Sequence, residues 1–162
     1  MKILFIQTGG TIDKDYEKGR KAYLFEITDP AVGRILKRAN PNFKYEVVTL
    51  TKKDSLDLTD ADRKKIYNYC AKSKEERIVI THGTDTMDKT AKLLSGLTGK
   101  TIVFTGSSRP ERFTDSDADF NLGGAITAVQ TLPHGVYVVM SGRVYPCDRF
   151  KKASDGQFVD KK

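Results

Sequence analysis

The sequence predicts an α/β fold, in which helices cover both faces of a parallel β-sheet. Short apolar runs typical of buried strands alternate with helical patterns, and this alternation indicates helical crossovers between parallel strands. Two of the apolar runs lead directly into loops rich in threonine and glycine. Because loops that leave the carboxyl ends of parallel strands meet in one crevice, the sequence also predicts a ligand site at that edge.

The strands are expected where the apolar runs lie. They occupy residues 2–7, 45–50, 77–81, 101–105 and 136–140. After Met140 the pattern dissolves, and we expect a peripheral hairpin followed by a frayed C-terminus. The expected architecture is flavodoxin-like, a three-layer parallel sheet with helices on both faces that forms a single domain over residues 1–162.

Capping residues indicate where the helices begin. Asp29 is an N-cap type and is followed by proline at the first helical position, so we expect a helix over about residues 29–39. Thr59 and Asp62 have the spacing of a capping box and indicate the start of the next helix. Further helices are expected over residues 84–94 and 120–132.

Composition limits the classes of function. Charged residues make up 30% of the 162 and hydrophobic residues 38%, which suits one domain with a buried core. The net charge of +7 is spread along the chain, so we expect neither a nucleic-acid nor a membrane partner. Cys70 and Cys147 lack metal-ligand spacing, and no apolar stretch approaches the ~20 residues of a membrane span. A reducing cytoplasm is the expected location.

Two loops concentrate polar groups directly after buried strands. Residues 8–12 are Thr-Gly-Gly-Thr-Ile, and the glycines allow a sharp turn that brings the backbone close to a ligand. Residues 81–87 are Thr-His-Gly-Thr-Asp-Thr-Met, in which Thr84 and Asp85 start a helix whose free N–H groups favour an anion or oxyanion. Together the loops offer hydroxyl nucleophiles, backbone donors and a carboxylate in a small volume, which favours acyl transfer.

Three further short segments accompany these two loops, and together they lie in a specific order and spacing along the chain. They are Asp54-Ser55-Leu56-Asp57, Gly106-Ser107-Ser108-Arg109-Pro110 and Phe120-Asn121-Leu122. In this combination the chain resembles the N-terminal domain of the bacterial-type L-asparaginase family, and the likeness extends to about residue 158. The segments at residues 8–12 and 81–87 are the specific ones, whereas the others are weak alone.

The resemblance implies which residues carry the attack on the substrate. Thr11 corresponds to the nucleophilic threonine of the family. Tyr23, or alternatively Tyr16, corresponds to a tyrosine on a flexible loop that assists the nucleophile. Ser107 lies where a backbone group helps to form the oxyanion hole. A threonine hydroxyl is a weak nucleophile that needs an adjacent base, which fits these assignments.

The resemblance also implies which residues bind the substrate and move protons. Ser55 matches the serine that holds the substrate's α-carboxylate. Thr84 and Asp85 match the second threonine and the acid that meets the substrate's ammonium group. Lys152 matches the lysine that pairs with this threonine and takes part in proton transfer.

Two features depart from the family pattern. Leu56 follows Ser55 where many members carry a polar residue that reaches the substrate's α-amino end. Family members also continue into a second domain that supplies an acid to a neighbouring subunit's site. We therefore expect a short one-domain member that self-associates, at least as a dimer, through residues 107–119 and the segment after Met140.

The leading hypothesis is an amidohydrolase that converts L-asparagine to L-aspartate and ammonia through a threonine acyl-enzyme, with no cofactor and no metal. The alternative is a non-catalytic or weakly active binding module for asparagine- or aspartate-like ligands. An RNA-linked amidotransferase component also resembles asparaginases, but the first strand begins at Lys2 and leaves no room for an extra N-terminal domain.

Overall fold

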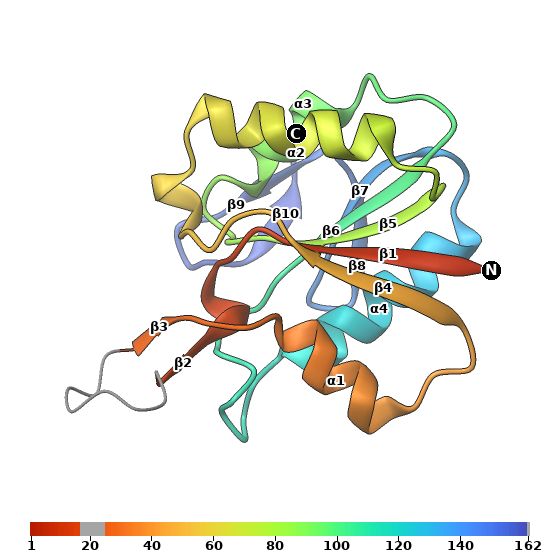
Figure 1. The fold of residues 1–162 in the computed structure, drawn as a ribbon. Coiled ribbons are helices and arrows are strands. Elements are labelled where there is room, and N and C mark those ends of the chain that lie inside the picture. The colour runs from red at the N-terminus through yellow and green to blue at the C-terminus, as the bar shows by residue number, and fades with distance from the viewer. Residues whose placement is uncertain (17–24, 162) are drawn as a thin grey trace.

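The computed structural model describes residues 1–16 and 25–161 and has a central β-sheet between two helical layers (Figure 1). In the described part of the chain, this sheet has six strands in the order β4-β1-β5-β6-β7-β8. Their bounds are β1 Lys2–Gln7, β4 Lys44–Thr49, β5 Arg77–Thr81, β6 Thr101–Thr105, β7 Gly135–Met140 and β8 Arg143–Pro146. The first five in this order are parallel, and β8 pairs antiparallel with β7. The mainly parallel sheet confirms the predicted fold class.

The strand order places a topological switch point between β1 and β5. From β1 the chain crosses over to β4 on one side, whereas the later strands β5, β6 and β7 follow on the other side. Crossovers in opposite directions leave a crevice at the carboxyl ends of the two strands at the switch point, and open α/β sheets bind their ligands there. The loops that follow β1 and β5 are the two threonine-rich loops of the sequence.

Helices cover both faces of the sheet. Their bounds are α1 Ala31–Ala39, α2 Asp60–Lys72, α3 Met87–Leu94 and α4 Ala118–Thr131. Helices α2 and α3 lie on one face and α1 and α4 on the other (Figure 1). The capping box predicted for α2 is confirmed, because Thr59 and Asp62 each accept a hydrogen bond from the other's backbone N–H. The cap predicted for α1 is wrong: the carboxylate of Asp13, not Asp29, accepts the N–H of Ala31 at 2.8 Å.

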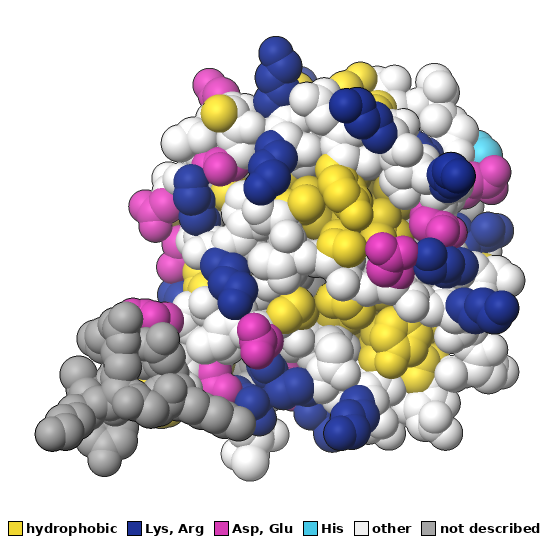
Figure 2. All heavy atoms as spheres, viewed as in Figure 1, with side chains coloured by type: hydrophobic (Ala, Val, Ile, Leu, Met, Phe, Trp, Pro, Cys, Tyr) yellow, Lys and Arg dark blue, Asp and Glu magenta, His cyan; other side chains and the backbone are white. Residues whose placement is uncertain are grey.

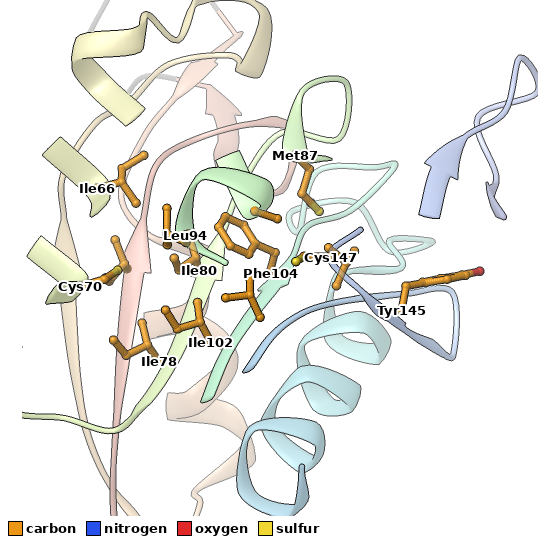
Figure 3. Close-up of a cluster of buried hydrophobic side chains, with 14 of the residues drawn as sticks. Ile66, Cys70, Ile78, Ile80, Met87, Leu94, Ile102, Phe104, Tyr145 and Cys147 are labelled. Atoms are coloured by element: carbon orange, nitrogen blue, oxygen red, sulfur yellow. The ribbon is translucent and has the colours of Figure 1, made fainter. Parts of the chain in front are cut away.

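The apolar core beneath α2 and α3 packs against alternate residues of the strands. Figure 3 shows Ile78 and Ile80 of β5 facing Cys70 of α2 and Leu94 of α3. Cys70 is fully buried, and this burial raises the pKa of its thiol to about 12. Cys70 is therefore an apolar packing residue rather than a reactive thiol, as its helical position indicated.

The C-terminal segment is folded onto the sheet, so the prediction of a frayed terminus is wrong as far as residue 160. Strands β9 (Phe150–Lys152) and β10 (Phe158–Asp160) form an antiparallel hairpin. Phe150 and Phe158 are buried and their rings stack with centroids 5.6 Å apart. The hydroxyl of Tyr145 donates to the carbonyl of Phe158 at 2.6 Å. These contacts fix the hairpin and thereby the position of Lys152 at the end of β9.

A second small hairpin follows β1. Strands β2 (Lys14–Tyr16) and β3 (Phe25–Ile27) pair antiparallel, and the segment that joins them lies outside the described residues. The ring of Phe25 contacts that of Phe113, with centroids 6.0 Å apart. Within the ranges that the structure describes, no helix is long and apolar enough to cross a membrane.

Candidate active site

Glycines let the loops at the carboxyl edge of the sheet touch one another through bare backbone. A Cβ atom on Gly10, after β1, would lie 2.5 Å from the Cα of Gly83, after β5. A Cβ on Gly83 would lie 2.8 Å from the Cβ of Ser55, in the connection after β4. A Cβ on Gly106, after β6, would lie 2.5 Å from the carbonyl oxygen of His82. The loops after β1 and β5 therefore meet at the switch point as predicted, and the loops after β4 and β6 join them there.

Thr11 begins a tight turn directly after this contact. Gly9 and Gly10 have φ of 114° and 95°, values that side chains other than glycine rarely adopt. Thr11 then opens a single 3-10 turn, Thr11–Asp13, and is half-buried. Its hydroxyl makes no hydrogen bond to any residue in the described ranges, so the group is available to a ligand.

The turn that carries Thr11 is anchored from behind. The buried Asp13 caps α1, and the N–H of Glu111 donates to the carbonyl of Ile12 at 3.2 Å. The carboxylate of Glu111 in turn accepts hydrogen bonds at 2.6 Å from Arg34 and from Arg38, both on α1. Helix α1 and the loop after β6 thus hold the same turn from opposite sides.

Lys152, Thr84 and Asp85 form a charged group beside the loop after β5. The Nζ of Lys152 lies 2.8 Å from the Oγ1 of Thr84 and 2.5 Å from the Oδ1 of Asp85. The side chains of Lys152 and Asp85 remain 31% and 48% exposed, so the pair borders solvent rather than core. Thr84 and Asp85 precede α3, which begins only at Met87, instead of starting the helix as predicted.

Ser55 contributes a buried hydroxyl that has no protein partner. It lies in the 3-10 turn Ser55–Asp57 and is 1% exposed, and within the described chain its Oγ makes no hydrogen bond. Its carbonyl accepts the hydroxyl of Thr86 at 2.6 Å, and that hydroxyl accepts from the guanidinium of Arg63 at 2.9 Å. An unpaired buried hydroxyl costs about 1–3 kcal/mol. Ser55 is therefore a buried polar group held in place beside Gly83 without a hydrogen-bond partner in the described chain.

Ser107 is buried at the end of β6. Its hydroxyl is used within its own turn, where it donates to the carbonyl of Arg109. The side-chain amide of Asn121 donates to the carbonyl of Gly106 at 3.1 Å and fixes the same turn. The side chain of Ser107 thus supports the loop, which leaves only its backbone for contact with a ligand.

His82 is buried, and both of its ring nitrogens are hydrogen-bonded. Its ring nitrogens lie 2.7 Å from the carbonyl of Gly83 and 2.8 Å from the hydroxyl of Thr90. Complete burial lowers the pKa of His82 to about 4, so the ring is neutral near pH 7 and acts as a hydrogen-bonded support. In the described ranges no cluster of three or more His, Cys, Asp or Glu side chains offers a metal site.

Comparison with known proteins now identifies the family. A profile of the family described as "Asparaginase, N-terminal" matches residues 2–159. The chain belongs to the asparaginase family. This confirms the resemblance found in the sequence.

Individual relatives carry two kinds of name. L-asparaginase 2 of Escherichia coli is 34% identical over 162 residues, covering 88% of this chain and 43% of that protein. A glutamyl-tRNA(Gln) amidotransferase subunit of Methanococcus vannielii is 34% identical over 152 residues, covering 88% of this chain and 34% of that protein. The chain therefore spans less than half the length of these two curated relatives.

Solved structures agree with the family assignment. The L-asparaginase of Thermococcus kodakarensis superposes with a TM-score of 0.81 at 29% identity, covering 99% of this chain and 51% of that one. L-asparaginase I of Vibrio cholerae gives a TM-score of 0.83 at 26% identity, covering 98% of this chain and 51% of that one. The single domain described here corresponds to about half of each asparaginase chain.

The structure gathers most of the residues that the asparaginase resemblance singled out. Thr84, Asp85 and Lys152 meet directly, and the loops of Thr11 and Ser55 adjoin them through the glycine contacts. Tyr23 lies outside the described residues. Tyr16 is on β2, with an exposed ring whose centroid is 5.3 Å from that of Phe25. The catalytic and binding roles of all these residues remain predictions.

Sequence reasoning did not single out three residues that hold the candidate site together. Asp13 and Arg63 are buried charged residues, and Thr86 is a buried hydroxyl at the end of a recognised motif. A buried charge is rare without a partner, but the sequence alone did not show that Asp13 and Arg63 are buried. The one signal present in the sequence was Thr86 itself, the second threonine of Thr84-Asp85-Thr86.

The contact between the glycine loops predicts a large cost for Gly10→Ala. The new Cβ would overlap the backbone of Gly83, and φ of 95° is strained for alanine. We expect a loss of about 2–4 kcal/mol in the free energy of unfolding, measured by urea denaturation. Gly33→Ala is the matched control, because its Cβ meets nothing within 4 Å on α1, and it should stabilise by up to about 1 kcal/mol. Equal stability of the two variants would contradict the packing described here.

The buried carboxyl of Asp13 predicts a specific pH dependence of stability. Burial raises its pKa from 3.8 to about 6, so the folded state holds this proton more tightly than the unfolded chain. The resulting stabilisation is complete below about pH 4 and is lost as the pH rises through about 6, in total about 3 kcal/mol.

Asp13→Asn keeps an acceptor for the cap of α1 and removes the titrating group. Urea unfolding between about pH 4 and pH 7 should therefore show a flatter dependence for this variant than for the wild type. Asp29→Asn changes an exposed carboxylate and should leave the wild-type slope intact. Identical slopes for the wild type and Asp13→Asn would disprove the assignment.

Proposed function

We propose that this domain is an amidohydrolase that converts L-asparagine to L-aspartate and ammonia through an acyl-enzyme on Thr11. The observation that carries the proposal is the meeting of Lys152 with Thr84 and Asp85 at the edge of the sheet to which the Thr11 loop also belongs. These residues come from distant parts of the chain, and the packing of the C-terminal hairpin on the core brings Lys152 to the loop after β5.

Substrate binding in this proposal uses the two polar groups that border the loop after β5. The unpaired hydroxyl of Ser55 donates to the α-carboxylate, and Asp85 receives the α-ammonium group. Because Asp85 is already paired with Lys152, the arriving ammonium competes with the lysine for the carboxylate. Substrate binding would thereby loosen Lys152 and allow its amine to exchange a proton with Thr84.

The reaction divides into two displacements at the side-chain carbonyl carbon of the substrate asparagine. The Oγ1 of Thr11 attacks the amide carbon and gives up its proton, while backbone N–H groups near Thr84 and Ser107 hold the oxyanion. The C–N bond then breaks, and the nitrogen leaves as ammonia after it accepts the proton that Thr11 gave up. Water positioned by Thr84 and Lys152 attacks the Thr11 ester, releases aspartate and restores the threonine hydroxyl. No cofactor takes part.

Two other functions would use the same site. A domain that binds asparagine or aspartate without turnover would bind both ligands saturably but release no ammonia. The relatives named as amidotransferase subunits favour the use of the same site to hydrolyse an amide donor within a complex. Ammonia release from L-asparagine, L-glutamine and D-asparagine, each offered separately, separates turnover from binding without turnover and identifies the amide that is hydrolysed. Because both cysteines are free and buried, we further propose a reducing, cytoplasmic location.

Thr11→Ala tests the nucleophile directly. Removal of the hydroxyl should lower kcat at least about 10³-fold, because no acyl-enzyme can form. The melting temperature should stay close to that of the wild type, since this hydroxyl has no partner among the described residues. Thr11→Ser should keep measurable activity. A fully active Thr11→Ala protein would rule out the mechanism.

Lys152→Met tests the proton-transfer group. The variant keeps the length of the side chain and removes the amine, so kcat should fall by about 10²–10⁴-fold. Lys151→Met, at the neighbouring exposed position of β9, is the matched control and should keep wild-type kinetics. If the two variants behave alike, Lys152 has no part in the reaction.

Self-association should complete this site, as we expect for a domain of a family whose sites lie between subunits. Phe120 on α4 is 65% exposed and Val144 on β8 is 45% exposed, and both line a hollow of about 550 Å³. We expect sedimentation velocity to detect at least a dimer, with an interface of about 1,200–2,000 Å². Phe120→Glu and Val144→Glu should weaken it, whereas Leu93→Glu on α3 should not. A monomer that keeps full activity on dilution would contradict this prediction.

A further inference from the structure

The face of the sheet that carries α2 has an open groove along its outer edge. The hollow has a volume of about 820 Å³ and is lined by α2 on one side and by the first residues of β1 and by β4 on the other. Leu4 and Tyr69 contribute its apolar walls, and Ala61 lies at its border. Figure 2 shows hydrophobic side chains exposed in the hollow below α2, with Lys and Arg side chains around it. We call this hollow the α2–β4 groove.

The groove exists because the helical layer ends before the sheet does. Strand β4 is the edge strand, and its residues Glu46 and Val48 pair in register with Leu4 and Ile6, which face the core beneath α2. Glu46 is nevertheless exposed and Val48 only half-buried. Parallel sheets normally have both faces covered by helices. The vacant place alongside α2 thus has the shape and polarity of a site for one more helix.

The charges around the α2–β4 groove select the kind of helix that fits. Its two acids, Glu46 and Glu75, are both neutralised by Lys2, at 2.7 and 3.1 Å. Other cations of the rim form no ion pair with any residue in the described ranges. They are Lys64, Lys65, Lys72 and Lys74, of which Lys65 donates to the carbonyl of Leu50. A row of uncompensated lysines beside an apolar floor is complementary to a segment that is apolar on one face and acidic along its flank.

We propose that the α2–β4 groove is a docking site for an amphipathic helix with an acidic flank, supplied by a partner protein. The apolar face of this helix packs on the half-buried Tyr69, and its acidic residues pair with Lys64 and Lys72 of α2 and with Lys74. The site lies away from the residues assigned to catalysis, so the proposal does not depend on the function of Thr11 or Lys152.

A synthetic peptide provides the probe. It is a fluorescein-labelled helix of about 18 residues with leucine at i, i+3, i+4 and i+7 and glutamate on the flanking positions. We expect saturable binding to the full chain by fluorescence anisotropy, weakened by added salt. The Lys64→Glu/Lys72→Glu/Lys74→Glu variant should raise Kd at least about tenfold. Ala61→Arg, a substitution at an exposed helical position, should block the groove and have a similar effect.

Matched controls separate a specific groove from general attraction. The variant Lys37→Glu/Lys92→Glu/Lys151→Glu makes the same charge change at exposed positions away from the groove and should keep the wild-type Kd within about twofold. A peptide of the same composition with its leucines scrambled should bind at least about tenfold more weakly. No saturable binding to the wild type, or equal binding by both triple variants or both peptides, would overturn the proposal. Self-association that Ala61→Arg abolishes, without peptide binding, would assign the groove to a second copy of the chain instead.

Discussion

Close backbone contact between glycine loops is the constraint on which the rest of the site depends. At the switch point between β1 and β5, Gly10 lies against Gly83, and Gly83 lies against Ser55, with no room for a methyl group at either glycine. This approach brings hydroxyls from separate crossovers into one crevice. The parallel sheet supplies the common edge, and the glycines remove the side chains that would otherwise keep the loops apart.

Hydrogen bonds from two carboxylate-bearing residues, Asp13 and Glu111, hold this arrangement in place from behind the crevice. Asp13 caps α1 from the turn that carries Thr11, and Glu111 joins the same turn to Arg34 of α1. Burial makes the ionised form of Asp13 costly, which its raised pKa expresses. The hydrogen bonds of Asp13 and Glu111 nevertheless tie the turn to α1 and to the loop after β6.

The C-terminal hairpin links core packing to the chemistry of the candidate site. Phe150 and Phe158 bury their rings in the core. Because Phe150 and Lys152 belong to the same strand, β9, this packing places Lys152 against Thr84 and Asp85. The asparaginase family membership of residues 2–159 agrees with this geometry, although the chain spans only part of the length of its relatives. The domain therefore presents a preformed cluster of polar side chains at the carboxyl edge of the sheet.

The sequence by itself determined the parallel sheet, the order of its elements and the segments that form the crevice, because strand alternation and glycine-threonine loops are local patterns. It also determined the α2 cap, which lies within four neighbouring residues. Only the tertiary structure decided that Asp13 caps α1, that the C-terminal hairpin is packed, and that Arg63 supports Ser55 through Thr86. Each of these depends on contacts between residues far apart in the chain, for which local periodicity carries no signal.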